Sequence, residues 1–320
     1  MNWRWRRSAA AVRPPAPPPA PPIGAPAPLE ILEQVRRLEL KMRRLVNSRF
    51  GGEYRSVYKG QGMEFSEVRE YQPGDEVRSI DWNVTARLQK PFVKRYVEER
   101  ELTVLLMVDC SASSHFGTRT RFKDDVGLEV AAVLGLSALR NNDRVGLIAF
   151  TDRIEHAVPP RKGRRHGLRL LRDLLALRPA GQRTDLAMAC EQAQRHLAHR
   201  SLVFIISDFQ DAGAEAALRR LAARHEVVVL TVDDPVEQAM PAAGVLVLAD
   251  PETGERVEVD TSDEAFRARY AAAAVAAAAQ RVQMFVRAGV TAVALRTDTS
   301  IVEPLLAFFR RSRPMARRSR

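Results

Sequence analysis

Cysteine and long apolar segments are scarce in this sequence of 320 residues. Its two cysteines, Cys110 and Cys190, are too few for a disulfide scaffold or a cysteine zinc site and suit a reducing compartment, so we expect a cytoplasmic protein. The most apolar run, Ala271 to Ala279, is short and almost entirely alanine. It suits a closely packed helix of a soluble protein better than a bilayer crossing, which needs about 20 residues.

Acidic residues are absent from both ends of the chain. Lysine and arginine together number 50 and aspartate and glutamate 39, which gives a net charge of +11. Residues 1–28 hold four arginines and residues 310–320 hold six, so ten of the eleven excess charges lie in the two tails. A nucleic-acid-binding domain would instead carry its basic residues on a folded face, because phosphate neutralisation supplies much of the affinity. We therefore expect no specific nucleic-acid partner.

Composition divides the chain into four parts. Residues 1–28 are rich in proline and alanine and cannot bury an apolar core, which predicts a disordered leader. Residues 29–100 are expected to contain an N-terminal helix, since apolar residues recur at spacings of three and four between Ile31 and Val46, and then a β-rich region. Residues 101–310 form the main domain, and residues 311–320 form a basic tail.

The β-rich region is rich in turn formers and lacks sustained helical periodicity, so we expect strands and tight turns. Pro73 and Gly74 predict a type II turn, because proline presets φ at one central position and glycine accepts a positive φ at the next. The region also carries a charged cluster with two interpretations, a binding surface or local ion pairs that hold loops in register: Arg69, Asp75, Arg78, Asp81, Trp82 and Arg87.

Strand and helix patterns alternate along the main domain. Leu102 to Val108 is a nearly unbroken apolar run, typical of a central parallel strand that is covered on both faces. The alternation predicts an α/β fold with a doubly wound, mostly parallel sheet, whose ligand crevice lies beyond the carboxyl ends of the strands. Further strands are expected at Val145–Phe150, Ile154–Val158, Leu202–Ile206, Val227–Val232 and Val290–Leu295, a hairpin at Val245–Val259, and helices around Asp124–Leu139, Gly167–Leu177, Asp185–Ala198, Ala214–Ala223, Glu264–Arg287 and Ile301–Arg310.

Side chains with oxygen donors gather at the predicted crevice. Two carboxylates and three hydroxyls lie in loops at one edge of the expected sheet: Asp109, Ser111, Ser113, Thr184 and Asp208. No histidine or cysteine is well placed among them. Such a donor set favours a hard divalent cation, Mg²⁺ first, over zinc or copper.

The charge of this set indicates what the cation would do. Two carboxylates balance a divalent ion without excess and hydroxyls are weak ligands, so a bound Mg²⁺ would keep an open coordination position. A carboxylate from a partner protein fits that position, which makes the metal a bridge and not a catalyst. In this interpretation Ser111, Ser113 and Thr184 bind the ion directly, and Asp109 and Asp208 bind it directly or through water. The alternative is that the hydroxyls simply cap helices.

The motif Asp109-x-Ser111-x-Ser113, together with Thr184 and Asp208, resembles the metal-ion-dependent adhesion site of von Willebrand factor type A domains. Those domains are doubly wound α/β modules that bind protein partners through Mg²⁺. The resemblance implies that the oxygen-lined edge is a metal site for protein binding.

Four motifs further upstream resemble the signature of the bacterial domain-of-unknown-function 58 family: Gly60-x-Gly62-x-Glu64-Phe65, Arg69-x-Tyr71-x-Pro73-Gly74-Asp75, Arg78-x-Ile80-Asp81-Trp82 and Ala86-Arg87. In that family the signature leads into a von Willebrand A-like domain, and members are linked with MoxR-type AAA+ ATPases. The resemblance implies an adaptor that brings client proteins to such an ATPase, in a chaperone-like role in maturation or assembly. Some members carry membrane segments, which this sequence does not show.

Two other functions stay open. The loop after the first strand also resembles the first motif of haloacid-dehalogenase phosphatases, but Ser111 stands where the general acid and base, an aspartate, would be, and no balancing lysine is evident. The arginine-rich tails, with Trp3 and Trp5, suggest peripheral contact with an anionic surface. No GxxxxGK[ST] phosphate loop is present, so any ATPase would be the partner. We therefore expect a protein that is not an enzyme.

Overall fold

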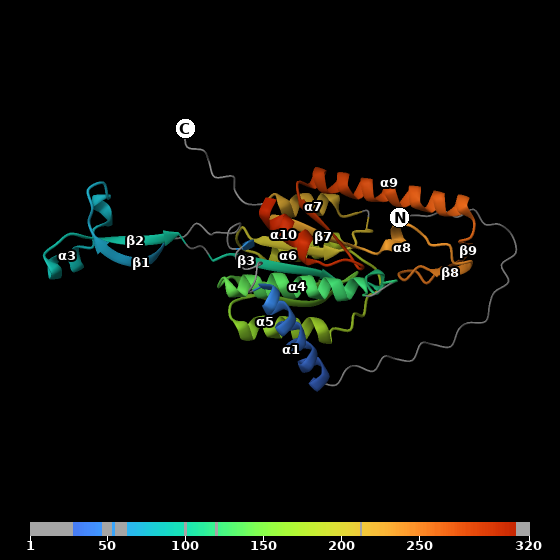
Figure 1. Cartoon of the computed structure of the whole chain (residues 1–320), viewed down its shortest axis with the longest axis horizontal. Coiled ribbons are helices and arrows are strands. Elements are labelled where there is room, and N and C mark those ends of the chain that lie inside the picture. Colours follow the sequence, from blue (N-terminus) through green and yellow to red (C-terminus); the bar gives the residue numbers. More distant parts are fainter. Residues whose placement is uncertain are drawn as a thin grey trace.

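The computed structural model describes residues 28–46, 53–54, 63–98, 101–118, 121–211 and 213–311 (Figure 1). The predicted leader and nearly all of the basic tail lie outside these residues, as do Gly60 and Gly62. The predicted N-terminal helix is present as α1 (Pro28–Leu45). It packs through Met42 onto the main domain, whose core that side chain joins.

A six-stranded sheet forms the centre of the main domain, in the order β10-β7-β6-β3-β4-β5. Neighbouring strands are parallel except for β4 and β5, which are antiparallel. This order and direction confirm the predicted doubly wound, mostly parallel sheet. The strands are β3 (Thr103–Asp109), β4 (Arg144–Phe150), β5 (Ile154–Arg161), β6 (Leu202–Ser207), β7 (Glu226–Asp233) and β10 (Thr291–Arg296).

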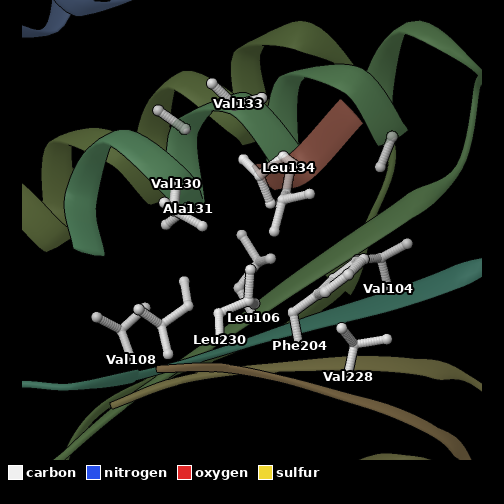
Figure 2. Close-up of a cluster of buried hydrophobic side chains, with 14 of the residues drawn as sticks. Val104, Leu106, Val108, Val130, Ala131, Val133, Leu134, Phe204, Val228 and Leu230 are labelled. Carbon is white, nitrogen blue, oxygen red and sulfur yellow. The ribbon is translucent and has the colours of Figure 1, made fainter. Parts of the chain in front are cut away.

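Helices cover both faces of the sheet. Because side chains alternate along a strand, Val104, Leu106 and Val108 of β3 face α4 (Figure 2), whereas Leu105 and Met107 join the core on the other face. The central strands are therefore apolar on both faces, as their sequence predicts. One face packs against α4 (Lys123–Arg140), α5 (Arg164–Ala176) and α10 (Val302–Arg311), and the other against α6 (Leu186–His196), α7 (Glu215–Ala222) and α9 (Glu264–Ala288).

Two small hairpins flank this domain. The predicted hairpin after β7 consists of β8 (Val245–Ala249) and β9 (Arg256–Asp260), and the short helix α8 (Pro235–Gln238) precedes it. Upstream, β1 (Met63–Glu70) pairs with β2 (Phe92–Glu98) as an arm that lies to one side of the main sheet (Figure 1). Within the part of the chain that the structure describes, no helix combines the length and apolar character needed to cross a membrane.

The arm differs from its prediction by one helix. Between β1 and β2 the chain forms α3 (Trp82–Leu88), where we expected only strands and turns. Asp81 caps this helix, since its Oδ1 accepts the N–H groups of Asn83 (3.0 Å) and Val84 (3.3 Å), and Gln89 ends it in a left-handed conformation. Seven residues are too few to show a helical period in the sequence.

The predicted turn at Pro73 is present. The N–H of Asp75 donates to the carbonyl of Gln72 (3.0 Å), and Gly74 takes the positive φ of 110° that a type II turn requires. Arg69 binds both carboxylate oxygens of Asp75, at 2.9 and 2.7 Å. For this pair the interpretation as a local ion pair is therefore correct.

Asp143 makes the fold sensitive to pH. It lies buried between α4 and β4, where its Oδ1 accepts the N–H of Leu102 and its Oδ2 the hydroxyl of Tyr54, both at 3.0 Å. Burial raises the pKa of Asp143 to about 6, although both hydrogen bonds oppose the shift. Between about pH 4 and pH 6 the folded chain keeps a proton that the unfolded chain releases, so the free energy of unfolding falls as the pH rises through this window.

We expect Asp143→Asn to remove this pH dependence. The amide keeps an oxygen for Leu102 and a polar group for Tyr54 but cannot ionise, so at neutral pH the variant should be about 1–3 kcal/mol more stable than the parent. Urea denaturation on both sides of pH 6 measures the difference. Glu258→Gln, on the exposed side of β9, is the control. Equal pH slopes for Asp143→Asn and the parent would contradict the assignment.

Candidate functional site

The candidate site lies where the sheet changes winding direction. From β3 the chain crosses through α4, on one face of the sheet, to β4. From β6 it crosses through α7, on the other face, to β7, which lies in the opposite direction along the sheet. The loops after the adjacent strands β3 and β6 therefore diverge, and in doubly wound sheets this is the position of the ligand crevice. Asp109 ends β3, and Ser207 and Asp208 end β6.

Asp109 is the anchor of the site and is buried. Its Oδ1 accepts the backbone N–H of Ser111 (2.9 Å), and its Oδ2 accepts the hydroxyl of Ser207 (2.6 Å). The hydroxyl oxygens of Ser111 and Ser113 lie 3.1 Å apart. The β3 loop thus folds back on the strand end and holds three of the predicted donors together.

Thr184 joins this group through a residue that the sequence did not reveal, Glu252. Oγ1 of Thr184 donates to Oε1 of Glu252 (3.1 Å), and the hydroxyl of Ser113 lies near enough to the same carboxylate to lower its pKa. Glu252 sits in the turn between β8 and β9, where Asp250 Oδ1 accepts its N–H (2.9 Å). The sequence predicts this hairpin but contains no signal for the direction in which its turn points.

Asp208 faces a buried cation, which is the second feature that the sequence did not reveal. Nζ of Lys123, in the first turn of α4, lies 2.9 Å from Oδ2 of Asp208 and 2.7 Å from Oε1 of Glu237. Burial disfavours the ammonium, but the two carboxylates outweigh it and raise the pKa of Lys123. A lysine in the first turn of a helix opposes the helix dipole, and this was the signal available in the sequence.

The site carries more negative than positive charge. Burial, reinforced by the nearby charge of Asp208, raises the pKa of Asp109 to about 6 against its hydrogen bonds from Ser111 and Ser207. Burial and the charges of Asp208 and Asp250 also raise the pKa of Glu252, although its hydroxyl donors oppose this. In both carboxylates burial is the largest cause of the raised pKa, and only hydrogen bonds oppose it.

A network behind the crevice fixes the strand ends. Arg281 of α9 binds both oxygens of Asp233 (2.8 and 3.0 Å) and donates to the carbonyl of Asp208 (2.6 Å). Asp234 caps α8 through the N–H of Val236 (3.0 Å), and its Oδ2 also accepts the hydroxyl of Thr297 (2.6 Å). Asp234 therefore caps a helix and also joins β7 to the loop after β10.

The five predicted residues all lie at this edge. Asp109, Ser111 and Ser113 are in direct contact, Thr184 reaches them through Glu252, and Asp208 is close enough to shift the pKa of Asp109 but is paired with Lys123. Among the described residues no three His, Cys, Asp or Glu side chains are grouped as a metal site. A cation here would therefore depend on the hydroxyl oxygens.

The hydroxyls of Ser111 and Thr184 do not cap helices. Ser111 makes no side-chain cap bond to the short 3-10 helix Ala112–Ser114, which it precedes. For α6 the cap is Asp185, which accepts the N–H of Met188 (2.8 Å). Both hydroxyls are thus directed to the crevice and not to helix ends.

The nearby Cys110 and His115 have no role at the crevice. Burial raises the pKa of Cys110 to about 12, and the side chain packs against the apolar core. His115 is exposed, lies 2.8 Å from Asp124 and stacks on Phe122. It is an exposed loop residue.

Comparison with known proteins places the site in a family context. Residues 67–281 match the sequence profile of the family described as "Protein of unknown function DUF58". The uncharacterized protein Rv1480 of Mycobacterium tuberculosis is 36% identical over 277 residues, covering 86% of this chain and 87% of the relative.

Similar solved structures include BatB from Bacteroides thetaiotaomicron, with a TM-score of 0.43 and 18% identity over 66% of this chain and 99% of that one. Another is the SpRpn10 VWA domain, with a TM-score of 0.39 and 12% identity over 65% and 94% of the two chains.

Removal of the Lys123 ammonium tests the ion-pair geometry. We expect Lys123→Met to lower the free energy of unfolding by about 3–5 kcal/mol, because Asp208 and Glu237 would keep buried charge without a partner. The exposed Lys90, which pairs with Glu70 at 3.1 Å, is the matched control, and Lys90→Met should cost less than about 1 kcal/mol.

Urea denaturation of the double variant Lys123→Met/Asp208→Asn separates charge from packing. It should recover part of the loss, since one unpaired charge is gone. A single Lys123→Met variant as stable as Lys90→Met would contradict the buried pair.

Proposed function

Since this chain belongs to the DUF58 family, whose function is unknown, and its main domain is von Willebrand A-like, we propose its function from the geometry of the crevice. The proposed function is protein binding through Mg²⁺, in which the cation links the domain to a carboxylate of the partner. The domain would act as an adaptor in the cytoplasm and not as an enzyme.

The observation that carries this proposal is the position of Glu252. A carboxylate from a separate hairpin accepts a hydrogen bond from the hydroxyl of Thr184 and lies near the hydroxyl of Ser113, two of the predicted metal donors. The crevice therefore already receives a carboxylate at the position where a partner's carboxylate is proposed. Glu252 would occupy this position until the partner displaces it.

The residues present fit a hard cation. Ser111, Ser113, Thr184 and Asp109 would hold it, and Asp208 would complete the set. All of these atoms are oxygens, which Mg²⁺ prefers. Burial raises the pKa of Asp109, and a cation beside it would favour the ionised carboxylate. When bound, the cation would supply a positive charge that attracts an external carboxylate.

The proposed partners are a MoxR-type AAA+ ATPase and its client proteins. The chain has no phosphate loop of the GxxxxGK[ST] type, so ATP hydrolysis would be the partner's task. The adaptor would bring a client to the ATPase for maturation or assembly. A carboxylate on either protein would displace Glu252 and complete the metal site.

Phosphatase activity is less well supported. Ser111 cannot act as the general acid and base that this chemistry needs. Lys123 does lie at the crevice, contrary to expectation, but its ammonium is bonded to Asp208 and Glu237 and so is not directed at a phosphate. A Mg²⁺-dependent phosphatase activity that Asp109→Asn abolishes would favour that function instead.

Loss of one hydroxyl tests the metal site. We expect Thr184→Val to weaken Mg²⁺ binding at least about tenfold, because the isosteric variant removes one oxygen donor. Isothermal titration calorimetry measures the affinity. Thr291→Val, on the exposed end of the edge strand β10, should bind Mg²⁺ as the parent does. Absence of Mg²⁺ binding by the parent, or equal affinity in both variants, would contradict the site.

Removal of the internal carboxylate tests the bridge. We expect Glu252→Ala to capture more of the MoxR-type ATPase than the parent in Mg²⁺, since the partner would no longer compete with Glu252, and Asp109→Ala to capture less. Glu255→Ala removes an exposed carboxylate from the same turn and is the control. Pull-downs with Mg²⁺ and with chelator measure capture. Capture by Asp109→Ala that equals the parent's in both conditions would refute the bridging mechanism.

A further inference from the structure

Helix α9 presents an exposed apolar row along its outer side. Val275, Val282 and Val286 are 69%, 58% and 74% exposed, values far above those of core residues. Three exposed alanines, Ala268, Ala272 and Ala279, continue the row. We propose that this row is an interface with a second copy of the chain, in which two α9 helices pack antiparallel.

The spacing of the row is that of a helix seam. Its six members follow one another at intervals of 4, 3, 4, 3 and 4 residues, the a and d positions of a heptad repeat: Ala268, Ala272, Val275, Ala279, Val282 and Val286. The buried side chains Met284, Phe285 and Ala288 lie on a different face, which packs on the domain. The seam therefore serves no contact within the described part of the chain.

The order of side chains along the seam is self-complementary. In an antiparallel pair centred on Ala277, Val286 meets Ala268 of the second copy, and Val282 meets Ala272. The central pair is Val275 with Ala279, so every layer joins one large and one small side chain. A parallel pair would instead place valine on valine and alanine on alanine, which packs unevenly.

The residues beside the seam suit the same arrangement. The adjoining positions on the solvent side are Arg269, Ala276 and Gln283, all exposed. In the antiparallel pair Arg269 would face Gln283 of the second copy, and Ala276 would face its own counterpart. These positions bring no like charges together.

The size and place of the seam also favour a second copy. Helix α9 lies along the outer border of the molecule (Figure 1), so two copies can approach through it. A twofold pair uses the same patch on both chains, which is the commonest form of self-association. One helix pair buries less area than a standard interface of about 1,600 Å², so the dimer is weak and depends on concentration.

Added charge in the seam tests the interface. We expect the parent to show a concentration-dependent dimer in sedimentation equilibrium and Val282→Glu to raise the dissociation constant at least about tenfold, because the carboxylate would be buried against Ala272 of the second copy. Gln280→Glu adds the same charge to the polar face of α9 and should dimerise as the parent does. Far-UV circular dichroism confirms that both variants fold.

Cross-linking with a short bismaleimide determines the direction of the pair. Ala276→Cys, beside the twofold axis, should cross-link to its own counterpart, whereas Ala265→Cys would lie about 36 Å from its counterpart and should not. The parent, with Cys110 and Cys190, is the blank. Equal cross-linking of both variants would indicate a parallel pair. A parent that stays monomeric at all concentrations, or a Val282→Glu variant that dimerises like the parent, would overturn the proposal.

Discussion

The parallel pairing of β3 with β6 is the constraint on which the crevice depends. Its register places Val108 beside Ile206, so the next residues, Asp109 and Ser207, lie next to each other where this pairing ends, and the hydroxyl of Ser207 donates to Asp109. Because the two strands continue to opposite sides of the sheet, no backbone closes over these residues. A shift of this register by one residue would turn the Asp109 side chain toward the opposite face of the sheet, and the site would be lost.

Burial of charge gives the crevice its chemical character. On one side of the crevice Lys123 forms ion pairs with Asp208 and Glu237. On the other side the carboxyl groups of Asp109 and Glu252 have raised pKa values. Water cannot relieve this excess as it would on an open surface. The proposed cation would offset this negative charge, and in the proposal the carboxylate of Glu252 stands where the cation would attract an external one.

The sequence predicts the sheet and the five oxygen donors because both depend on local patterns. Apolar runs identify strands such as Leu102–Val108, and the rule that loops at strand ends form the crevice brings Asp109 and Asp208 together. Glu252 and Lys123 were missed because their positions depend on how the β8–β9 hairpin and the first turn of α4 pack against the sheet. The periodicity of the sequence contains no information on this packing. The helix α3 was missed because it is only seven residues long, so its start at the capping residue Asp81 is not followed by a helical period in the sequence.

The most direct test of the account is the position of a metal in crystals of the full chain grown with Mn²⁺ in place of Mg²⁺. Anomalous scattering locates the ion without reference to activity or partner. The account predicts a single strong peak in bonding contact with hydroxyl oxygens of Ser111, Ser113 and Thr184. A crevice without a peak, in which Glu252 keeps its hydrogen bond from Thr184 in the presence of the metal, would contradict it.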